Sequence, residues 1–445
     1  MITDVIIVGS GFAGLAAAIE AYDAGATVVV VEKRLVPGGN SMIAYGSVNA
    51  VDPKRQKPQG IKDSVELHYK HTLEGGDFIA DEKRVRYMVE HALDCIHWFE
   101  NFGVSWPDRV IWGYGAMWPR THGAPAYGKY KRGAALIHAH LDQLKKRGVP
   151  ILLNHKVSKI LRENPFDGDI TGVEVEAKDE KLRILAKRAI VLASGGFAAN
   201  LQWVVTHDPR LSVTDTTNHP EATGECIKLA QDIGAATVHM DYIQCVIKRV
   251  KAPFKAMGLL ISDSNPSIPH PGIPYRIIVN KDGERIVSED ARRVDITHAL
   301  LEQPLFDPCL SSEANSLEEL EKSFHISTGN LVDTIERYNQ CCTKRCDSDF
   351  GKHIPVLAPI EVPPFKAESI AVARHHTMGG LRVAGTTGQV IDRWEKAIPR
   401  LYAAGEVTGG LHGTNRLGNN AIPDCIVFGR LCGRNAAEAP RDKPL

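Results

Sequence analysis

Arg416 lies in a glycine-rich segment near the end of the chain, where a cation could act on a bound ligand. The segment runs from Ala403 to Cys432 and reads AAGEVTGGLHGTNRLGNNAIPDCIVFGRLC. Five glycines before its helical run let backbone approach a large ligand closely: Gly405, Gly409, Gly410, Gly413 and Gly418. A guanidinium in this frame is suited to holding a carboxylate bidentately. Asn419 and Asn420 precede an apolar helical run, whose N-terminus would favour a pyrophosphate or an electron-rich ring.

A second glycine pattern opens the chain. Asp4–Val8 is expected to form a buried strand, and the turn GSGFAG (Gly9–Gly14) and an alanine-rich helix at Leu15–Tyr22 follow it. A second strand, Thr27–Val31, ends in Glu32. In this context the glycines admit a pyrophosphate to the helix start, and the acid can bond a ribose hydroxyl. The alternative is a tight strand–helix turn with no ligand, but the pattern favours a dinucleotide.

Three motifs together carry a resemblance to a known family. AGEVTGGLHGTNRLGNNAI at Ala404–Ile422, HHTMGGL at His375–Leu381 and PGGNS at Pro37–Ser41 resemble the fumarate reductase flavoprotein family. The likeness is greatest to its soluble flavocytochrome branch and to the related urocanate and other 2-enoate reductases, and it runs from Val5 to Gly433. It implies an α/β fold, in which a Rossmann-like FAD-binding domain of the glutathione reductase type carries an inserted α+β capping, or clamp, domain.

The resemblance also implies domain boundaries and a cofactor. We expect the FAD-binding domain at 1–241 and 375–445, with the clamp domain at 242–374. Membrane-bound members attach FAD to a histidine near the PGGNS segment, whereas Asn40 and Ser41 stand there in this chain. We therefore predict non-covalent FAD. The expected cofactor contacts are Gly9, Gly11, Phe12, Ala13, Gly14, Glu32, Lys33, Gly38, Gly39, Asn40, Ser41, Gly46, Ser47, Val157, Ala193, Ser194, Gly195, Asn218, Thr223, Gly224, Gly405, Glu406, Asn420, Ala421 and Ile422. For Thr223 a plain helix N-cap is an equal alternative.

The chemistry implied by the resemblance is hydride transfer between flavin N5 and an activated C=C bond, with a proton added at the neighbouring carbon. His375 and Arg416 match the family's carboxylate clamp. Arg293 matches its proton donor, because it follows the expected strand Gly283–Glu289, and Asp263 stands where the family places the acid that supplies protons. The alternatives are a core histidine bonded to backbone for His375, and a solvated charge pair for Arg293 and Asp263.

The chain departs from the family at the far end of the substrate. Fumarate reductases read IQAHP there, and their histidine holds the second carboxylate; this chain reads IQCVI at Ile243–Ile247. Val246 cannot bind an anion. We therefore expect one carboxylate or carbonyl at His375 and Arg416, and an apolar or bulky distal end near Val246, Ile247 and the loop Trp112–Trp118. His122, which lies in the same loop, Trp112–Gly128, could touch flavin or substrate or be merely hydrogen-bonded.

The clamp region has a composition of its own. From Tyr242 to Arg374 we expect irregular loops, a Pro-rich stretch at 265–274, and acidic helices at Ser316–Ser323 and Thr328–Tyr338. The clamp is shorter than the family's after Gln303, where Pro304–Pro308 bridges the place of a strand-bearing segment. Cys341, Cys342 and Cys346 are one thiol short of an iron–sulfur set, so no metal is expected.

The bulk composition limits the classes of partner that this chain is expected to bind. The 445 residues include 53 Lys+Arg and 53 Asp+Glu, which gives a net charge of zero and no argument for nucleic acid or an anionic membrane. No apolar run approaches the roughly 18 residues needed to span a bilayer, and nine cysteines fit reduced thiols better than a disulfide framework. Since the N-terminus enters a strand at once, we expect a cytoplasmic protein.

Three hypotheses follow for the function. The first is an FAD-dependent reductase of a 2-enoate other than fumarate, supplied with electrons by a separate donor. The second is a dehydrogenase that desaturates a saturated acid or a ketosteroid, although Arg416 in the sequence NRLG argues against a ketosteroid. The third is a non-catalytic flavin subunit that passes electrons within a complex.

Overall fold

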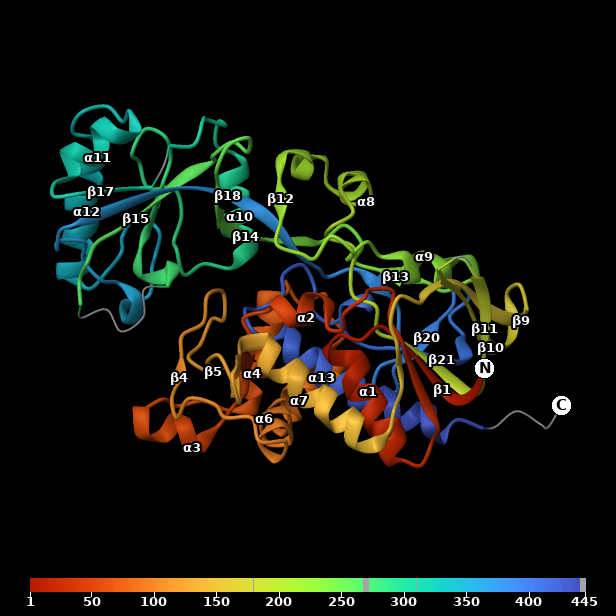
Figure 1. The fold of residues 1–445 in the computed structure, drawn as a ribbon. Coiled ribbons are helices and arrows are strands. Elements are labelled where there is room, and N and C mark those ends of the chain that lie inside the picture. Colours follow the sequence, from red (N-terminus) through yellow and green to blue (C-terminus); the bar gives the residue numbers. More distant parts are fainter. Residues whose placement is uncertain (179, 267–271, 310, 441–445) are drawn as a thin grey trace.

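The computed structural model describes residues 1–178, 180–266, 272–309 and 311–440. Two lobes make up the molecule, and the long strand β18 (Phe365–Thr377) runs from the smaller lobe to the larger one (Figure 1). Each lobe is built on one sheet. The seam between the lobes is where segments far apart in the sequence meet.

The sheet of the larger lobe has eight strands in the order β20-β21-β11-β1-β2-β8; β10 also pairs with β11, and β9 pairs with β10. The neighbours from β21 to β8 are parallel, whereas β20 and the β9–β10 ribbon are antiparallel. The bounds are β1 Ile2–Val8, β2 Val28–Val31, β8 Ile151–Leu152, β9 Lys156–Asn164, β10 Asp167–Ala177, β11 Glu180–Leu192, β20 Gln389–Ile391 and β21 Ala397–Ala403. Val28–Val31 is buried on both faces, as a central parallel strand requires.

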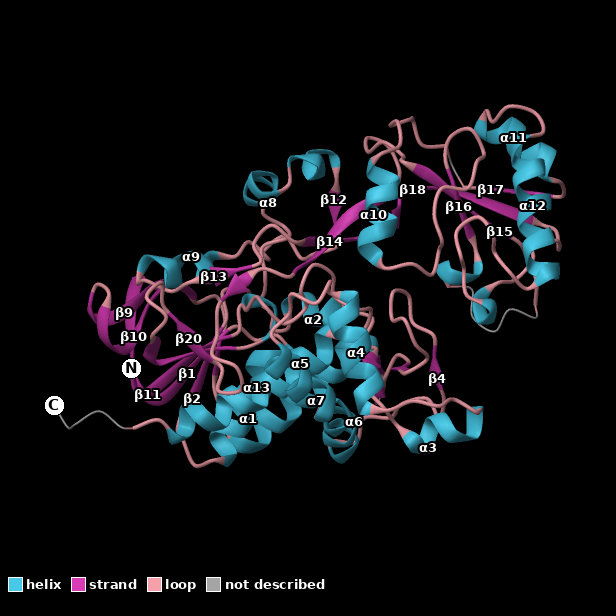
Figure 2. Cartoon of the chain, turned by 180° about the vertical axis from the view of Figure 1, so that it is seen from behind, coloured by secondary structure: helices cyan, strands magenta, loops and turns pink. Residues whose placement is uncertain are grey.

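Helices cover one face of this sheet (Figure 2). Alanine-rich α1 (Phe12–Asp23) packs between α7 (Arg132–Arg147) and α13 (Ala421–Glu438). Glycines let α13 come this close, because a Cβ on Gly429 would lie 2.5 Å from the Ala13 carbonyl oxygen and one on Gly433 2.3 Å from that of Ala17. Packing of α13 against α1 thus joins two segments that are about 400 residues apart in the sequence.

The smaller lobe contains most of a six-stranded sheet. Its path is β12-β18-β15-β16, and β14 and β17 also pair with β18. The strands are β12 Asp215–Thr216, β14 Ile243–Arg249, β15 Gly258–Ser262, β16 Ile277–Val279, β17 Ser312–Ala314 and β18. Helices α10 (Arg293–Leu301), α11 (Leu317–Phe324) and α12 (Asn330–Lys344) complete the lobe around a separate apolar core. The expectation of irregular loops from 242 to 374 was therefore wrong for these strands, although both acidic helices are present.

The remaining elements are short and lie mostly in the larger lobe and at the seam. They are α2 Gly39–Ile43, β3 Val48–Asn49, α3 Pro53–Gln56, α4 Val65–Gly75, α5 Glu82–Glu90, α6 Ala92–Asn101, β4 Val110–Ile111, β5 Thr121–His122, β6 Ala126–Tyr127, β7 Tyr130–Lys131, α8 Leu201–His207, α9 Glu225–Asp232, β13 Thr237–Val238 and β19 Gly380–Leu381. No helix among the described residues is both long and apolar enough to cross a bilayer.

The strand expected at Gly283–Glu289 is absent, and only a single bridge joins Arg285 to Val279. The physical reason is an ion cluster. Glu289 is fully buried, accepts a hydrogen bond from the Ile278 amide at 3.0 Å and pairs with Arg285 and Lys352. These side-chain bonds replace a backbone ladder. Within the Pro-rich stretch expected at 265–274, residues 267–271 lie outside the described chain.

Candidate cofactor and substrate site

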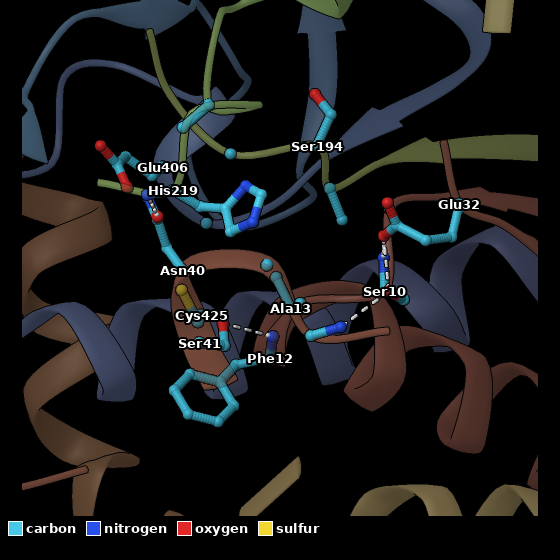
Figure 3. A pocket seen from close by; sticks show the side chains of 18 of the residues that line it. Ser10, Phe12, Ala13, Glu32, Asn40, Ser41, Ser194, His219, Glu406 and Cys425 are labelled. Atoms are coloured by element: carbon cyan, nitrogen blue, oxygen red, sulfur yellow. Dashed lines mark hydrogen bonds between the residues drawn. The ribbon is translucent and has the colours of Figure 1, made fainter. Parts of the chain in front are cut away.

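A cleft of about 660 Å³ opens at the carboxyl ends of β1 and β2 (Figure 3). Most of the expected cofactor contacts line it: Gly9, Gly11, Phe12, Ala13, Glu32, Lys33, Gly38, Gly39, Asn40, Ser41, Ala193, Ser194, Gly195, Gly405 and Glu406. The carboxyl ends of parallel strands are where such folds bind dinucleotides.

The first strand–helix turn cannot accommodate larger residues. A Cβ on Gly9, whose φ is +104°, would lie 2.4 Å from the Ala193 carbonyl oxygen, and one on Gly14 would lie 2.0 Å from that of Gly9. Ser41 accepts a hydrogen bond from the Phe12 amide at 3.0 Å and so joins the PGGNS segment to the start of α1. The start of α1, at Gly11 to Ala13, lines the cleft, which is where an anion site would lie.

Glu32 closes one end of the cleft (Figure 3). It follows β2 and is 7% exposed; it accepts hydrogen bonds from the Ser10 amide at 3.1 Å and the Ser10 hydroxyl at 2.5 Å. An adjoining cavity of about 440 Å³ is lined by Val157 together with Glu32, Ser194 and Cys226. The two cavities share Gly9, Glu32, Lys33 and Ser194, so together they can hold one elongated ligand.

Two buried guanidiniums lie at the seam. Arg416 is 3% exposed and donates to the Leu417 carbonyl at 3.1 Å. Arg293, the first residue of α10, is 8% exposed and donates to the Gln244 side chain at 3.4 Å and to the Tyr114 carbonyl at 3.1 Å. Within the described chain neither guanidinium forms an ion pair. Burial, and then repulsion by Arg293, lowers the pKa of Arg416 to about 9.

His375 faces the same two cations. It lies near the end of β18, and its Nδ1 is 2.7 Å from the hydroxyl of Thr217. Burial, followed by the charges of Arg416 and Arg293, lowers its pKa well below the ordinary value. The imidazole is therefore neutral at pH 7. Among the residues that the structure describes, no carboxylate is bonded to the two guanidiniums, so the cluster carries both of their charges. Such a cluster favours a bound anion.

Comparison with known proteins places this geometry in a family. Residues 4–422 match the family described as FAD binding domain. The chain belongs to that family, and its cofactor is FAD. NADH:fumarate oxidoreductase of Klebsiella pneumoniae is 37% identical over 460 residues, which cover 98% of this chain and 48% of that protein. Urocanate reductase of Eggerthella lenta is 30% identical over 470 residues, which cover 98% of this chain and 74% of that protein.

The solved structures agree with this. A flavocytochrome c3 fumarate reductase in its open conformation superposes with a TM-score of 0.73 at 30% identity, over 98% of this chain and 78% of that chain. The resemblance to fumarate reductase flavoproteins and the expected α/β fold are thereby confirmed. The chain spans about half the length of the Klebsiella relative.

Several expected cofactor contacts do not line either cavity. Gly46 and Gly224 are required by packing, since a Cβ on Gly46 would lie 2.7 Å from the Arg132 backbone and one on Gly224 2.5 Å from the Trp203 ring. Thr223 accepts a hydrogen bond from Lys33 at 3.3 Å and does not cap α9. The others outside the two linings are Gly14, Ser47, Asn218, Asn420, Ala421 and Ile422.

Two of these residues position the site from behind. Asn218 accepts a hydrogen bond from Asn40 at 2.5 Å and donates to the His375 carbonyl at 3.2 Å, which links the cleft to β18. Asn420 precedes α13, but its side chain bonds Asn49 and Thr72 and does not cap the helix. The N-terminus of α13 thus keeps its amides free of a side-chain cap. Cavity residues missed by sequence reasoning include Ser10, His219, Ala222, Glu225, Cys226 and Cys425.

Asp263 has other partners than expected. Its carboxylate accepts hydrogen bonds from the amides of Glu361 at 2.9 Å and Val362 at 3.0 Å, and from Asn265 at 3.2 Å. In the described chain no hydrogen bond or ion pair joins Asp263 to Arg293, so the expected contact between them is not observed. Asp263 instead fixes the segment that leads into β18.

Glu406, an expected cofactor contact, also belongs to a buried network with His376 that sequence reasoning did not predict. Glu406 accepts a hydrogen bond from the Thr377 amide at 2.9 Å and lies 3.5 Å from Nδ1 of His376. Burial raises the pKa of Glu406 to about 7. His376 is buried as well, and its ring lies 5.6 Å from that of His412. His122, in contrast, is fully buried between the Asp52 carboxylate and the Val48 carbonyl, so its partners are structural.

Proposed function

We propose that this chain is an FAD-dependent oxidoreductase that reduces the C=C bond of a 2-enoic acid other than fumarate. The observation that carries the proposal is the pair of buried guanidiniums, Arg293 and Arg416, which face His375 and have no carboxylate partner in the described part of the chain. Burying a charge is costly unless a partner offsets it. A substrate carboxylate is the partner that this arrangement favours.

Each residue of the cluster has a distinct role in the proposal. Arg416 holds the substrate carboxylate bidentately, and neutral His375 donates a hydrogen bond to it. As the carboxylate becomes enolate-like, both contacts strengthen and stabilise the transition state. FAD, when bound and reduced by the electron donor, would supply the hydride that reaches the β-carbon.

Arg293 adds the proton at the α-carbon in this proposal. Burial lowers the pKa of Arg293, which makes the guanidinium a stronger acid than it is in water. The C=C bond then takes up one hydride and one proton and becomes a saturated C–C bond. Arg293 must afterwards be reprotonated, and Asp263 does not contact it in this structure.

We further propose that FAD is held non-covalently along the two adjoining cavities. The pyrophosphate fits the start of α1, where Gly11 brings its backbone amide to the cleft, and Glu32 is placed for a ribose. Residues 1–241 and 375–445 would form the FAD-binding domain and 242–374 the clamp domain. The mostly separate sheet of the smaller lobe supports this division, although β12 joins that sheet from the first part.

We also propose a separate electron donor and a cytoplasmic location. The nine free cysteines fit a reducing compartment. The Klebsiella relative, which is named for NADH, is about twice the length of this chain.

The decisive experiment uses the protein with its flavin photoreduced under anaerobic conditions. It is mixed with fumarate, acrylate, cinnamate or urocanate, and flavin reoxidation is followed by absorbance. We expect at least one monocarboxylic enoate to reoxidise the flavin, and Arg293→Ala to lose this reaction while its flavin still bleaches. If no enoate reoxidises the flavin faster than buffer, the proposal is wrong and an electron-transfer subunit is the better description.

A further inference from the structure

Asn415 directly precedes Arg416, and its buried side chain joins three elements across the seam between the lobes. Its Nδ2 donates to the Gly75 carbonyl at the end of α4 at 3.0 Å. Its Oδ1 accepts from Nε2 of Gln244 on β14 at 2.9 Å and from the Val294 amide on α10 at 3.3 Å. Figures 1 and 2 show α10 and β14 on the side of the smaller lobe that faces α4.

The orientation of this side-chain amide follows from its main-chain partners. The Gly75 carbonyl can only accept a hydrogen bond and the Val294 amide can only donate one, so Nδ2 must face the first and Oδ1 the second. The same reasoning fixes Gln244, whose Nε2 donates to the Arg416 carbonyl at 2.7 Å and whose Oε1 accepts from the Arg293 guanidinium at 3.4 Å. Exchanging oxygen and nitrogen in either side chain would break the array.

Arg293 is held through both of its neighbours in the chain. Val294 lies in the first turn of α10, where amides have no partner within the helix, and Asn415 supplies that partner. On the other side, Arg292 pairs with Asp77 at 2.6 Å, and both side chains are partly exposed. Exposed ion pairs contribute little, whereas a buried amide left without its acceptor is costly. Asn415 is therefore the stronger constraint on the start of α10.

The backbone around Arg416 is fixed on the end of α4. The Thr414 amide donates to the Gly76 carbonyl at 3.2 Å, and a Cβ on Gly413 would lie 2.0 Å from the same oxygen. From the smaller lobe, Gln244 holds the Arg416 carbonyl. The segments that carry the two arginines are thus joined by neutral amides, which leave both guanidinium charges in place.

We infer that Asn415 is a positioning residue, which fixes the proton donor Arg293 relative to the carboxylate bound at Arg416. The inference rests on the proposed function. Because Asn415 ties α10 and β14 to the Arg416 segment, it sets the distance between the guanidinium that gives the proton and the α-carbon that takes it. A misplacement of about 1 Å can cost about 100-fold in rate. Sequence reasoning assigned no role to Asn415, because its partners are 121 to 340 residues away in the sequence.

The test compares Asn415→Ala with the unaltered holoprotein, whose flavin is photoreduced and then reoxidised by fumarate, acrylate, cinnamate or urocanate. With the enoate that reacts fastest, we expect kcat to fall about 30-fold to 100-fold, because Arg293 is displaced. KM should change less than about threefold, since Arg416 and His375 still bind the carboxylate. The solvent deuterium isotope effect on kcat should rise, because proton transfer becomes slower relative to hydride transfer. Hydrogen exchange in the first turn of α10 should become faster as well.

Asn339→Ala is the matched control. Asn339 lies on α12, and its side chain also bonds one main-chain carbonyl and one main-chain amide, both of Ile360 and both at 2.9 Å. Its removal should lower the melting temperature, as Asn415→Ala is expected to do, because main-chain groups lose a partner in both variants. The kcat of the control should stay within about twofold, since its partners lie on other segments than those that carry the two arginines.

Asp77→Asn tests the competing contact and remains available if Asn415→Ala does not fold. Asparagine tolerates the left-handed backbone of residue 77, whose φ is +55°, so the fold should be kept. Only the exposed pair with Arg292 is weakened, and we expect kcat to stay within about threefold of the unaltered protein. A loss of about tenfold or more would place the positioning of Arg293 on that ion pair and overturn the inference.

An Asn415→Ala variant that keeps kcat within about threefold overturns the inference, and so does one that raises KM while kcat and the isotope effect stay unchanged. An equal loss of kcat in Asn339→Ala overturns it too, because general destabilisation would then explain both. If none of the four enoates reoxidises the unaltered protein, the proposed function fails, and the inference that rests on it fails with it.

Discussion

Replacing Arg416 by methionine should abolish most carboxylate recognition without destabilising the protein. Methionine keeps an unbranched side chain of similar reach but removes the charge. A structural arginine would show the opposite behaviour, because breaking a buried ion pair leaves an uncompensated partner. Arg416 has no such partner in the described chain, so the two roles predict different results.

The size of both effects can be worked from the site. Burial lowers the pKa of Arg416 from 12.5 to about 9, which corresponds to an upper bound of about 5 kcal/mol at about 1.4 kcal/mol per pKa unit. Because the folded-state pKa lies below the unfolded value, this cost to stability is fully present at pH 7 and shrinks only above about pH 9. The Leu417 carbonyl also accepts the Asn420 amide at 3.2 Å, so the variant orphans no acceptor. We therefore expect an unchanged or raised melting temperature.

For activity, truncating one partner of a buried charge pair costs about 2 to 5 kcal/mol. We expect kcat/KM for the enoate to fall at least about 30-fold in Arg416→Met. The assay is reoxidation of photoreduced flavin by the preferred enoate, together with thermal unfolding of the same preparations. Flavin content is measured first, so that loss of cofactor is not mistaken for loss of substrate binding.

Arg84→Met is the matched control. Arg84 is also a buried arginine, but it donates to the Gly409 carbonyl at 2.6 Å and to the Thr408 hydroxyl at 3.0 Å. Its removal leaves a buried carbonyl without that donor, so it should lower the melting temperature. If Arg416→Met keeps kcat/KM within threefold of the unaltered protein, or loses stability as Arg84→Met does, the assignment of Arg416 as an anion site is refuted.

Three further predictions follow from the site. Since the pKa of Glu406 is raised from 4.5 to about 7, its stabilising contribution in the flavin-free protein is present below pH 4.5 and lost as pH rises through 7. Glu406→Gln should remove about 3 kcal/mol of this pH dependence of the free energy of unfolding. The measurement is urea titration of both proteins at pH values on either side of this range. Asp263→Asn should lower the melting temperature yet keep enoate turnover within threefold; a tenfold loss would contradict the observed geometry. Gly14→Ala should yield colourless protein, because its Cβ meets the Gly9 carbonyl, whereas Gly385→Ala, with open space around it, should purify yellow.

Some parts of the fold could be predicted from the sequence. In these parts the local residue pattern favours the same secondary structure that packing in the folded chain requires. β1, the Gly9–Gly14 turn and α1 lie within two or three residues of their expected bounds, because each is specified by contacts within a short stretch of chain. The helix after Asn420 begins where expected for the same reason. Glycine requirements in the first turn also follow from local backbone geometry.

The sheet of the smaller lobe could not be predicted in this way. β14, β15 and β17 all pair with β18, a strand that follows them by about 50 residues or more. These short segments have no clear hydrophobic periodicity of their own, so pairing with a distant strand determines their secondary structure. The same holds for Gly283–Glu289. There Glu289 forms a buried ion pair with Lys352, about 60 residues away in the sequence, and the strand that local propensity predicts does not form.

The candidate site shows why its residue types were predictable and its contacts were not. Arg293 is held by the Tyr114 carbonyl and the Gln244 side chain, and Arg416 by the Leu417 carbonyl. Neutral acceptors orient these guanidiniums without neutralising their charge, whereas carboxylate partners would have neutralised it. The charge is therefore retained for a ligand. Motifs identify the two arginines, but the choice of neutral rather than acidic acceptors arises from loops and strands that meet only in the folded chain.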